Sequence, residues 1–312
     1  MAGTAGEHGR EIAGTGVERT RCYPDGVRIG IHTSIAGSLE RAALKAHDLG
    51  ANCFQIFSAS PRMWRASAPD ATQVKLLKAA RERYDLTPLA VHVSYLVNLA
   101  SLDPVVRGKS IDGFAGELSR AEAIGAEYLV THPGVARNCT VEQGIAAFVL
   151  GLKEAAECAR TRCVTVLLEN TVGAGGQLGG RLEELAAIRE LAAELAEVPI
   201  GYCLDTCHLL AAGFEVRTAA GLIRTVKKIG TVLGLDRVGV IHANDSRSPF
   251  GSRVDRHANI GEGHIGRDGF RRILQHPQLL SKPFILETPV DKEGDDRRNL
   301  EALKSLAARR RR

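Results

Sequence analysis

Short apolar runs and longer amphipathic stretches alternate along most of this chain. The apolar runs are rich in β-branched and aromatic residues, which is typical of strands buried on both faces. We predict strands at 27–32, 52–57, 88–93, 127–132, 164–169, 199–205, 237–242 and 283–288. We predict helices at 38–50, 71–84, 111–125, 141–160, 181–196, 218–230 and 268–276, with Gly50, Gly125 and Gly230 following three of them as C-cap residues. Eight strands with helices between them favour an α/β fold with a single (β/α)8 barrel over a doubly wound sheet.

The same pattern divides the chain into three parts. We expect a polar, flexible N-terminal extension at 1–26, one barrel domain at 27–305 and a basic C-terminal tail at 306–312. Residues 1–26 have no continuous apolar segment of the kind found in secretory signals. No apolar run approaches the roughly 18 to 20 residues that cross a bilayer. We therefore expect a cytoplasmic protein with no membrane partner.

Charge and cysteine content change this picture little. The net charge is +5, and Arg309–Arg312 contribute four positive charges, so the body of the chain is only weakly basic. Such a body does not by itself indicate a nucleic-acid partner, and we interpret the arginine tail as a solvated terminus. The seven cysteines lack the spacing of a disulfide scaffold, so we expect reduced thiols.

The candidate chemistry lies at the ends of the predicted strands. Six consecutive strands end at or near a histidine, aspartate or glutamate, and three further residues of this kind lie in the loops that follow. The set is His92, His132, Glu169, Asp205, His208, His242, Asp255, His257 and Glu287. A charged group at the end of a buried strand costs free energy unless something binds it. Because the C-terminal ends of barrel strands converge on one face, we predict a metal cluster there.

The donor types suggest which ions such a cluster binds. Imidazole nitrogens with carboxylate oxygens suit zinc in a catalytic site, with manganese or iron as alternatives. Nine ligands are too many for one ion, and at roughly three protein ligands per catalytic metal they imply two or three ions. Clustered divalent ions suit the in-line displacement of a phosphoester, and they make an acidic pocket attractive to phosphate.

We do not expect the remaining histidines, or the cysteines that flank Asp205, to bind metal. Cys203 and Cys207 flank Asp205, but we do not expect either thiol to bind metal, because 207 lies beyond the strand end. We interpret His32 as a neighbour of the ligands rather than a ligand. The loop residue His264 receives no role. His8, His47 and His276 are interpreted as surface residues.

These motifs, in this order, resemble the endonuclease IV family of zinc-dependent apurinic/apyrimidinic endonucleases in the xylose isomerase-like TIM barrel superfamily. The resemblance runs from about residue 28 to 303 and rests on RIGIHTSIAGS, HVSYLVNL, THPG, LLENTVGAG, LDTCHLLAAG, HANDS, FGSRVDRHANIGEGHIG and ILET. It implies a TIM barrel with three Zn²⁺ ions, for which Mn²⁺ is a possible substitute. The implied activity is hydrolysis of the phosphodiester 5′ of an abasic site in damaged double-stranded DNA, which leaves a 3′-hydroxyl, and trimming of blocked 3′ ends.

The resemblance also implies roles for the ligand residues. His92, His132 and Glu169 would hold one zinc, and Glu169 would be the catalytic bridging carboxylate to a second zinc. Asp205, His242 and Glu287 would complete that second site, and His208, Asp255 and His257 would hold the third. A zinc-bound hydroxide would then be the nucleophile.

For DNA contact the resemblance points to Arg62 and Tyr95, with Trp64 as a weaker candidate whose alternative is simple packing. The chain departs from the family pattern beside Arg62, where Ala59, Ser60, Pro61 and Met63 replace polar residues that the family pattern leads us to expect. This departure concerns the loop that the resemblance places in the DNA stack and leaves the metal ligands unaffected.

Two other functions compete with this interpretation. A metal-dependent sugar isomerase or epimerase on the same barrel would use one ion held by residues resembling Glu169, Asp205, His242 and Glu287, and would leave the other five ligands without use. A non-catalytic abasic-DNA binder predicts the loss of a bridging ligand, and none is missing. A monomer suffices for the nuclease mechanism, so we expect a monomer.

Overall fold

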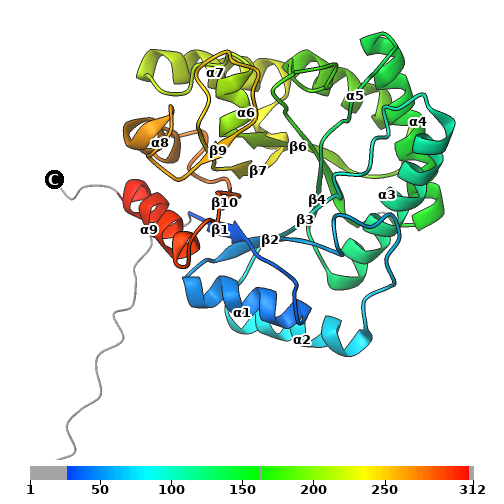
Figure 1. The fold of residues 1–312 in the computed structure, drawn as a ribbon, viewed down its shortest axis with the longest axis horizontal. Coiled ribbons are helices and arrows are strands. Elements are labelled where there is room, and N and C mark those ends of the chain that lie inside the picture. Colours follow the sequence, from blue (N-terminus) through cyan, green and yellow to red (C-terminus); the bar gives the residue numbers. More distant parts are fainter. Residues whose placement is uncertain (1–26, 162, 309–312) are drawn as a thin grey trace, which may run out of the picture.

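Eight strands hydrogen-bond side by side into a closed parallel barrel within the part of the chain that the structure describes (Figure 1). The structure, a computed structural model, describes residues 27–308 apart from 162. Around the barrel the strands follow the order β1, β10, β7, β6, β5, β4, β3, β2. Their bounds are β1 Ile29–His32, β2 Cys53–Phe57, β3 Leu89–His92, β4 Tyr128–Thr131, β5 Thr165–Glu169, β6 Ile200–Asp205, β7 Val238–His242 and β10 Phe284–Leu286. The predicted (β/α)8 barrel is confirmed, with each strand one or two residues shorter than expected at one or both ends.

Helices form a ring outside the barrel (Figure 1). They cover the apolar outer faces of the strands, which is why their inward-facing residues belong to one large core cluster. Their bounds are α1 Leu39–Leu49, α2 Ala71–Arg83, α3 Pro104–Ile124, α4 Val141–Ala159, α5 Leu182–Leu195, α7 Ala219–Val232, α8 Gly266–Leu274 and α9 Asp295–Ala307. A short helix α6, Thr206–Ala211, and a 3-10 turn, Leu235–Arg237, lie in the connections around β6 and β7.

The predicted helix ends agree with the structure at two C-cap glycines and differ at a third and at the start of α3. Gly50 and Gly125 end α1 and α3 with φ of 87° and 72°, as expected of left-handed C-caps. The prediction for Gly230 was wrong, because α7 continues to Val232 and the left-handed residue is Gly234, with φ of 81°. Helix α3 also begins at Pro104, seven residues before the expected start, since the side chain of Asp103 caps it.

Side chains that point into the barrel form two layers. The lower layer is a small apolar cluster of Cys53, Ala90, Val130, Leu167, Cys203, Val240 and Ile285. Strand residues alternate between faces, so the residue two positions further along each strand also points inward, nearer the C-terminal end. Those positions hold Gln55, His92, His132, Glu169, Asp205, His242 and Glu287. An apolar floor therefore supports a polar layer at the mouth of the barrel.

A small hairpin lies over that mouth. Strand β8 is Asp245–Ser246 and strand β9 is His257–Ala258, and the two pair antiparallel, with Asp245 opposite Ala258 and Ser246 opposite His257. The hairpin joins β7 to α8, so the loop residues between β8 and β9 lie directly beyond the end of β7. This placement brings residues 255 and 257 to the mouth of the barrel.

The structure describes the C-terminal end of the expected barrel domain but not the N-terminal extension. The polar extension at 1–26 and residues Arg309–Arg312 of the basic tail lie outside the described residues. Helix α9 runs to Ala307, past the expected domain boundary at 305, because Leu306 and Ala307 are buried in the core. None of the helices in the described part of the chain is both long and apolar enough to cross a membrane.

Candidate metal centre

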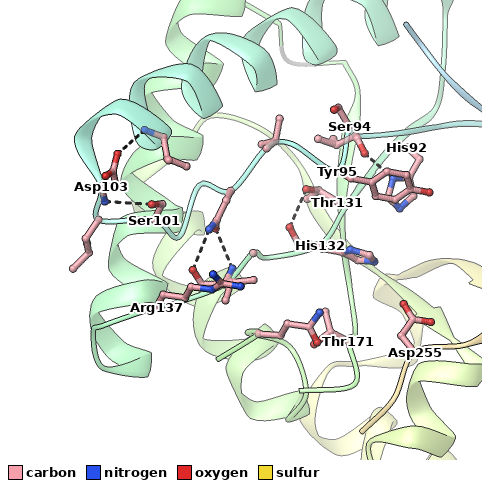
Figure 2. A pocket seen from close by; sticks show the side chains of 18 of the residues that line it. His92, Ser94, Tyr95, Ser101, Asp103, Thr131, His132, Arg137, Thr171 and Asp255 are labelled. Carbon is pink, nitrogen blue, oxygen red and sulfur yellow. Dashed lines mark hydrogen bonds between the residues drawn. The ribbon is translucent and has the colours of Figure 1, made fainter. Parts of the chain in front are cut away.

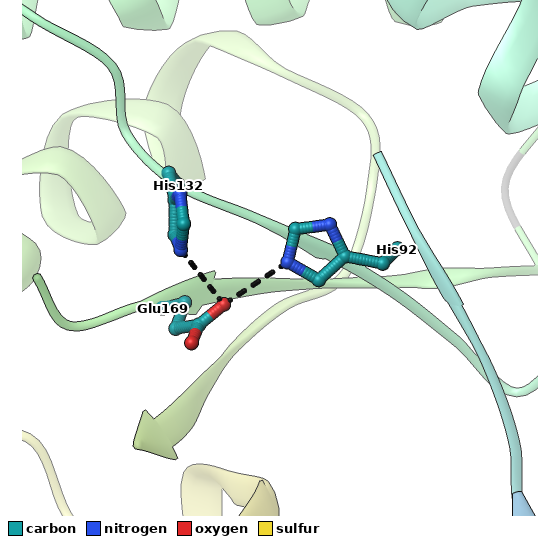
Figure 3. Close-up of side chains that lie close together, drawn as sticks. All are labelled: His92, His132 and Glu169. Carbon is teal, nitrogen blue, oxygen red and sulfur yellow. Dashed lines mark hydrogen bonds and ion pairs between the residues drawn. The ribbon is translucent and has the colours of Figure 1, made fainter. Parts of the chain in front are cut away.

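Three side chains from neighbouring strands form a first group of ligand-type residues. His92 ends β3, Glu169 ends β5, and His132 follows β4 directly. Oε2 of Glu169 lies 3.2 Å from Nε2 of His92 and 3.2 Å from Nε2 of His132 (Figure 3). All three ligand-type atoms are within 4.8 Å of one another. Two imidazole nitrogens and a carboxylate oxygen at this spacing form a donor set suited to zinc.

Glu169 also belongs to a second group, with Asp205, His242 and Glu287. Nδ1 of His242 lies 3.0 Å from Oε1 of Glu169 and 3.2 Å from Oε2 of Glu287. Glu169, Asp205 and His242 are fully buried. A buried carboxylate whose two oxygens face different groups is suited to bridging two ions.

The third group joins His208, Asp255 and His257. His208 lies on α6, where Oδ1 of Asp205 accepts its backbone N–H at 2.7 Å, so the local DTCH sequence sets its position. Nε2 of His208 is 3.2 Å from Oδ2 of Asp255, and Nε2 of His257 is 3.4 Å from Oδ1 of the same carboxylate. Nε2 of His257 is buried without a hydrogen-bond partner among the described residues. A buried, unpartnered nitrogen facing a carboxylate fits a bound cation.

The outer nitrogen of most of these rings is occupied by an acceptor. Nδ1 of His92 donates to the carbonyl of Val93 at 2.8 Å, and Nδ1 of His208 donates to the carbonyl of Asn170 at 2.9 Å. Nδ1 of His257 lies 3.1 Å from the carbonyl of Glu287, to which it donates. A backbone acceptor on one nitrogen directs the other into the group, where it can bind a metal once its proton is displaced.

The electrostatics of the cluster are set by charge pairing inside a buried volume. Burial alone would raise the pKa of Glu169, but the imidazoles of His242 and His132 hold it well below the usual range of a carboxyl. Burial alone would lower the pKa of His208, but the carboxylates of Asp205, Asp255 and Glu169 raise it to about 10. Carboxylates and protons therefore balance each other in the metal-free cluster, and a divalent cation can replace the protons.

Two residues that support the cluster were missed by the sequence analysis. Gln55, fully buried on β2, donates to Oε1 of Glu287 at 2.5 Å and accepts from Nε2 of His242 at 2.9 Å. Asn244 donates to Oδ2 of Asp205 at 2.6 Å and accepts the backbone N–H of Glu287 at 2.8 Å. A signal for Gln55 existed, since it is a polar residue within an apolar strand and lies two positions after an inward-facing apolar residue.

Three residues that we did not expect to bind metal also lie close to the cluster. Nδ1 of His32 is 3.1 Å from Nε2 of Gln55 and 3.8 Å from Oε1 of Glu287, as expected for a neighbour of the ligands. The sulfur atoms of Cys203 and Cys207 also come within 4.8 Å of ligand-type atoms. Burial raises the pKa of each thiol to about 12, which disfavours the thiolate that binds metal.

The candidate DNA contacts surround the cluster on loops that follow β2 and β3. Arg62 is exposed. Tyr95 is 68% exposed, with its ring centroid 5.3 Å from that of Phe57. Trp64 is half-buried next to α3, and Nζ of Lys109 lies 5.8 Å from the centroid of its ring. Arg62 and Tyr95 are therefore accessible to a substrate, although the Tyr95 ring also contacts Phe57, while Trp64 is half-buried beside Lys109.

A cavity of about 840 Å³ opens beside the cluster. Its lining includes the ligand-type residues His92, His132 and Asp255 together with Tyr95. Figure 2 shows His92 and Asp255 at one end of the cavity, and Asp103 at the other. The volume suits a nucleotide-sized group next to the metal ligands.

Comparisons with known proteins agree with this architecture. A family model described as "Xylose isomerase-like TIM barrel" matches residues 43–309. The "Probable endonuclease 4" of Solibacter usitatus is 68% identical over 281 residues, which is 90% of this chain and 97% of that protein. The crystal structure of endonuclease IV from Thermus thermophilus matches with a TM-score of 0.80 at 38% identity, covering 89% of this chain and 98% of that one.

A more distant likeness concerns the fold alone. A D-tagatose 3-epimerase-like protein matches with a TM-score of 0.65 at 21% identity, covering 89% of this chain and 96% of that one. The closed barrel and the ligand-type residues at its mouth define a protein of the xylose isomerase-like TIM barrel class. Within this class, the chain belongs to the endonuclease IV family. The family resemblance inferred from the motifs is confirmed.

Proposed function

We propose that this protein is a zinc-dependent apurinic/apyrimidinic endonuclease. It hydrolyses the phosphodiester 5′ of an abasic site in double-stranded DNA, leaves a 3′-hydroxyl and trims blocked 3′ ends. The observation that carries the proposal is the meeting of nine ligand-type residues in three groups at the barrel mouth, two of which share Glu169. Membership of the endonuclease IV family supports the same activity.

The donor set fits three divalent ions. His92, His132 and Glu169 would hold the first, and Glu169, Asp205, His242 and Glu287 the second. His208, Asp255 and His257 would hold the third. Nitrogen and oxygen donors favour zinc, and manganese remains a chemically acceptable substitute. Such ions, when bound, activate water at neutral pH and stabilise the charge that develops on the phosphate oxygens.

The protein's own residues position these ligands and shape the substrate cavity. Gln55 holds Glu287 and His242 in place, and Asn244 holds Asp205. The apolar layer beneath the cluster keeps water away from its lower side. The cavity beside His92 and Asp255 receives the sugar-phosphate of the damaged nucleotide, which is easiest to take out of the helix where base pairing is already lost.

The exposed loops are proposed to contact the duplex. Arg62 and Tyr95 lie on the two loops that border the cluster and would enter the base stack at the lesion. Trp64 would contribute mainly by supporting the Arg62 loop against α3. The altered residues around Arg62 lie on the same loop, so this chain inserts a less polar surface than the family pattern predicts.

A sugar isomerase or epimerase is the weaker candidate. It needs only the second group, and it leaves His92, His132, His208, Asp255 and His257 unused. The likeness to an epimerase-like protein at 21% identity concerns the barrel and carries no argument for that activity. A non-catalytic DNA binder has no need for a complete ligand set.

The test is incision of a duplex oligonucleotide that carries one tetrahydrofuran abasic analogue. The analogue cannot undergo β-elimination, so only phosphodiester hydrolysis gives a 3′-hydroxyl product. The assay compares protein as purified, protein stripped with a chelator, and stripped protein given zinc back, on damaged and intact duplexes. We expect incision at the analogue that is lost on stripping and restored by zinc. Absence of cleavage by protein shown to carry its metals contradicts the proposal and favours the isomerase. Sedimentation of the active protein tests the expected monomer.

A further inference from the structure

Asp245 lies on β8, the strand that pairs with β9 and its ligand-type residue His257, but it belongs to none of the three ligand groups. Asp245 is fully buried on β8, three residues after His242. Its two oxygens accept hydrogen bonds from the backbone N–H groups of five residues at 2.8 to 3.2 Å: Ser246, Gly261, Gly263, Ile265 and Gly266. A buried carboxylate is costly unless its charge is satisfied, and here backbone dipoles satisfy it.

The loop 261–266, with sequence GEGHIG, needs its glycines in order to wrap around this carboxylate. Gly261 and Gly266 have φ of 84° and 69°, which point their N–H groups back toward Asp245. A Cβ at Gly263 would lie 2.4 Å from the carbonyl oxygen of Ser246 and 2.5 Å from Oδ1 of Asp245. The loop therefore wraps closely around a side chain of its own chain.

Asp245 itself has no oxygen left for an ion. Oδ1 accepts from Ser246 and Ile265, and Oδ2 accepts from Gly261, Gly263 and Gly266. Each oxygen already has at least two donors, which is the usual capacity of a carboxylate oxygen. Its effect on the metal centre must pass through the segment that it holds.

That segment begins three residues after β9, the strand that carries His257 of the third group. Asp245 pairs with Ala258 across the hairpin, and Ser246 pairs with His257, so the strand pairing holds β9 and the carboxylate holds the loop that follows it. Asp255 lies two residues before His257. The backbone N–H of His264 also donates to the carbonyl of Ser246 at 2.7 Å, on the same side of the loop. Movement of 261–266 would displace His257 relative to His208, which belongs to a different element.

We propose that Asp245 is a positioning residue for the group formed by His208, Asp255 and His257. Its carboxylate acts as an internal anion that orders the glycine loop and so sets the distance between the ligands of the third ion. The inference rests on the metal centre of the proposed function. It assigns a role to the GEGHIG motif, to which the ligand chemistry gives none.

The experiment measures bound metal directly. Asp245→Asn keeps the size of the side chain but turns an acceptor into a donor that faces other donors. Wild-type protein and variants are stripped, dialysed against buffers of fixed free Zn²⁺, and assayed for zinc per chain; Co²⁺ loading gives an independent absorption spectrum. We expect Asp245→Asn to weaken one equivalent by about 10- to 100-fold, with the others unchanged, as for loss of an outer hydrogen-bond partner of a metal ligand.

Three further variants make the result specific. Asp255→Ala removes a ligand and should lose the same equivalent of zinc. In the double variant, Asp245→Asn should weaken zinc binding little further. Gly263→Ala displaces the loop while the carboxylate remains, so it should reproduce the selective loss if Asp245→Asn does not fold. Glu262→Gln changes an exposed carboxylate of the same loop, whose contacts are a hydrogen bond from Asn259 and an ion pair with Arg298, and should keep full metal content.

The outcomes separate the inference from the proposed function. Circular dichroism establishes that Asp245→Asn and Gly263→Ala are folded. If both folded variants keep full metal content with wild-type affinity, the role of Asp245 is overturned. Uniform weakening of every equivalent also overturns it, since that pattern indicates general destabilisation. If wild-type protein binds no divalent ion, the proposed function fails and the inference falls with it.

Discussion

Oε1 of Glu169 lies 3.0 Å from Nδ1 of His242, and this contact joins the first and second ligand groups. The other oxygen of Glu169 faces the opposite way, toward the imidazoles that end β3 and follow β4. The carboxylate is 0% exposed, so neither oxygen is shared with solvent. One side chain at the end of β5 therefore connects two halves of the cluster.

Glu169→Gln should abolish cleavage and leave binding of damaged DNA largely intact. The amide keeps the shape of the side chain but removes the charge and one acceptor that two ions would share. Outer-shell changes in metal sites already cost about 10- to 100-fold, so we expect at least a 100-fold fall in incision rate. Incision kinetics and binding of a tetrahydrofuran duplex measure the two effects, and a near wild-type rate would show the assignment to be wrong.

Gln55→Leu should reduce metal affinity without removing a ligand. It deletes the hydrogen bonds that hold Glu287 and His242, so both side chains gain freedom that binding must remove. We expect zinc affinity of one site to fall about 10- to 100-fold in chelator competition. Gln73→Leu, on the outer helix α2, is the matched control and should keep wild-type affinity. Equal affinities in the two variants would exclude Gln55 as a support of the cluster.

Cys203→Ala and Cys207→Ala should keep the full metal content. Both sulfur atoms come close to ligand-type atoms, but burial raises the pKa of each thiol to about 12, so the thiolate form is scarce at neutral pH. Zinc per chain after dialysis is the measurement, with Asp205→Asn as the variant expected to lose metal. Loss of an equivalent in either cysteine variant would identify that thiol as a ligand.

Arg62→Ala should weaken the selection of abasic over intact DNA more than it affects the metals. The side chain is exposed on the loop after β2, from which we propose that it enters the stack at the lesion. Stacking contacts contribute about 1–3 kcal/mol, so we expect selectivity to fall roughly tenfold, with unchanged zinc content. Arg65→Ala removes the same charge from the same loop, where the guanidinium pairs with Asp112 at 3.1 Å. Equal selectivity for abasic over intact DNA in the two variants would show that Arg62 does not contact the lesion.

Zinc affinity should rise with pH. The carboxylates around His208 overcome burial and raise its pKa to about 10 in the metal-free protein, against an ordinary value of 6.5. A raised pKa means that the proton stabilises the metal-free fold fully below pH 6.5, and that this contribution is lost as pH rises toward 10. Zinc must displace the proton, so affinity should increase by up to about tenfold per pH unit in that window. Chelator competition at pH 7, 8 and 9 measures it, and a flat profile would contradict the expectation.

Much of the architecture could be read from local pattern. Runs of apolar residues at the spacing of buried strands, with amphipathic stretches between them, predicted every strand of the barrel, because each needs an apolar environment on both faces. Helix ends were less certain. Gly230 had the right residue type for a C-cap, but packing of α7 carried the helix past it to Val232. Helix α9 was not predicted, since its stability comes from Leu300, Leu303 and Leu306 packing into the core.

The sequence by itself determined which residue types stand at the strand ends, because the alternation of side chains along a strand is a local property. The grouping of those residues depended on closure of the barrel, which sets β10 between β1 and β7. That order brings Gln55 within 2.9 Å of His242, although 187 residues separate them in the chain. It also lets the loop before α8 fold around Asp245. Contacts between distant segments leave little trace in local pattern, so only the tertiary structure decided them.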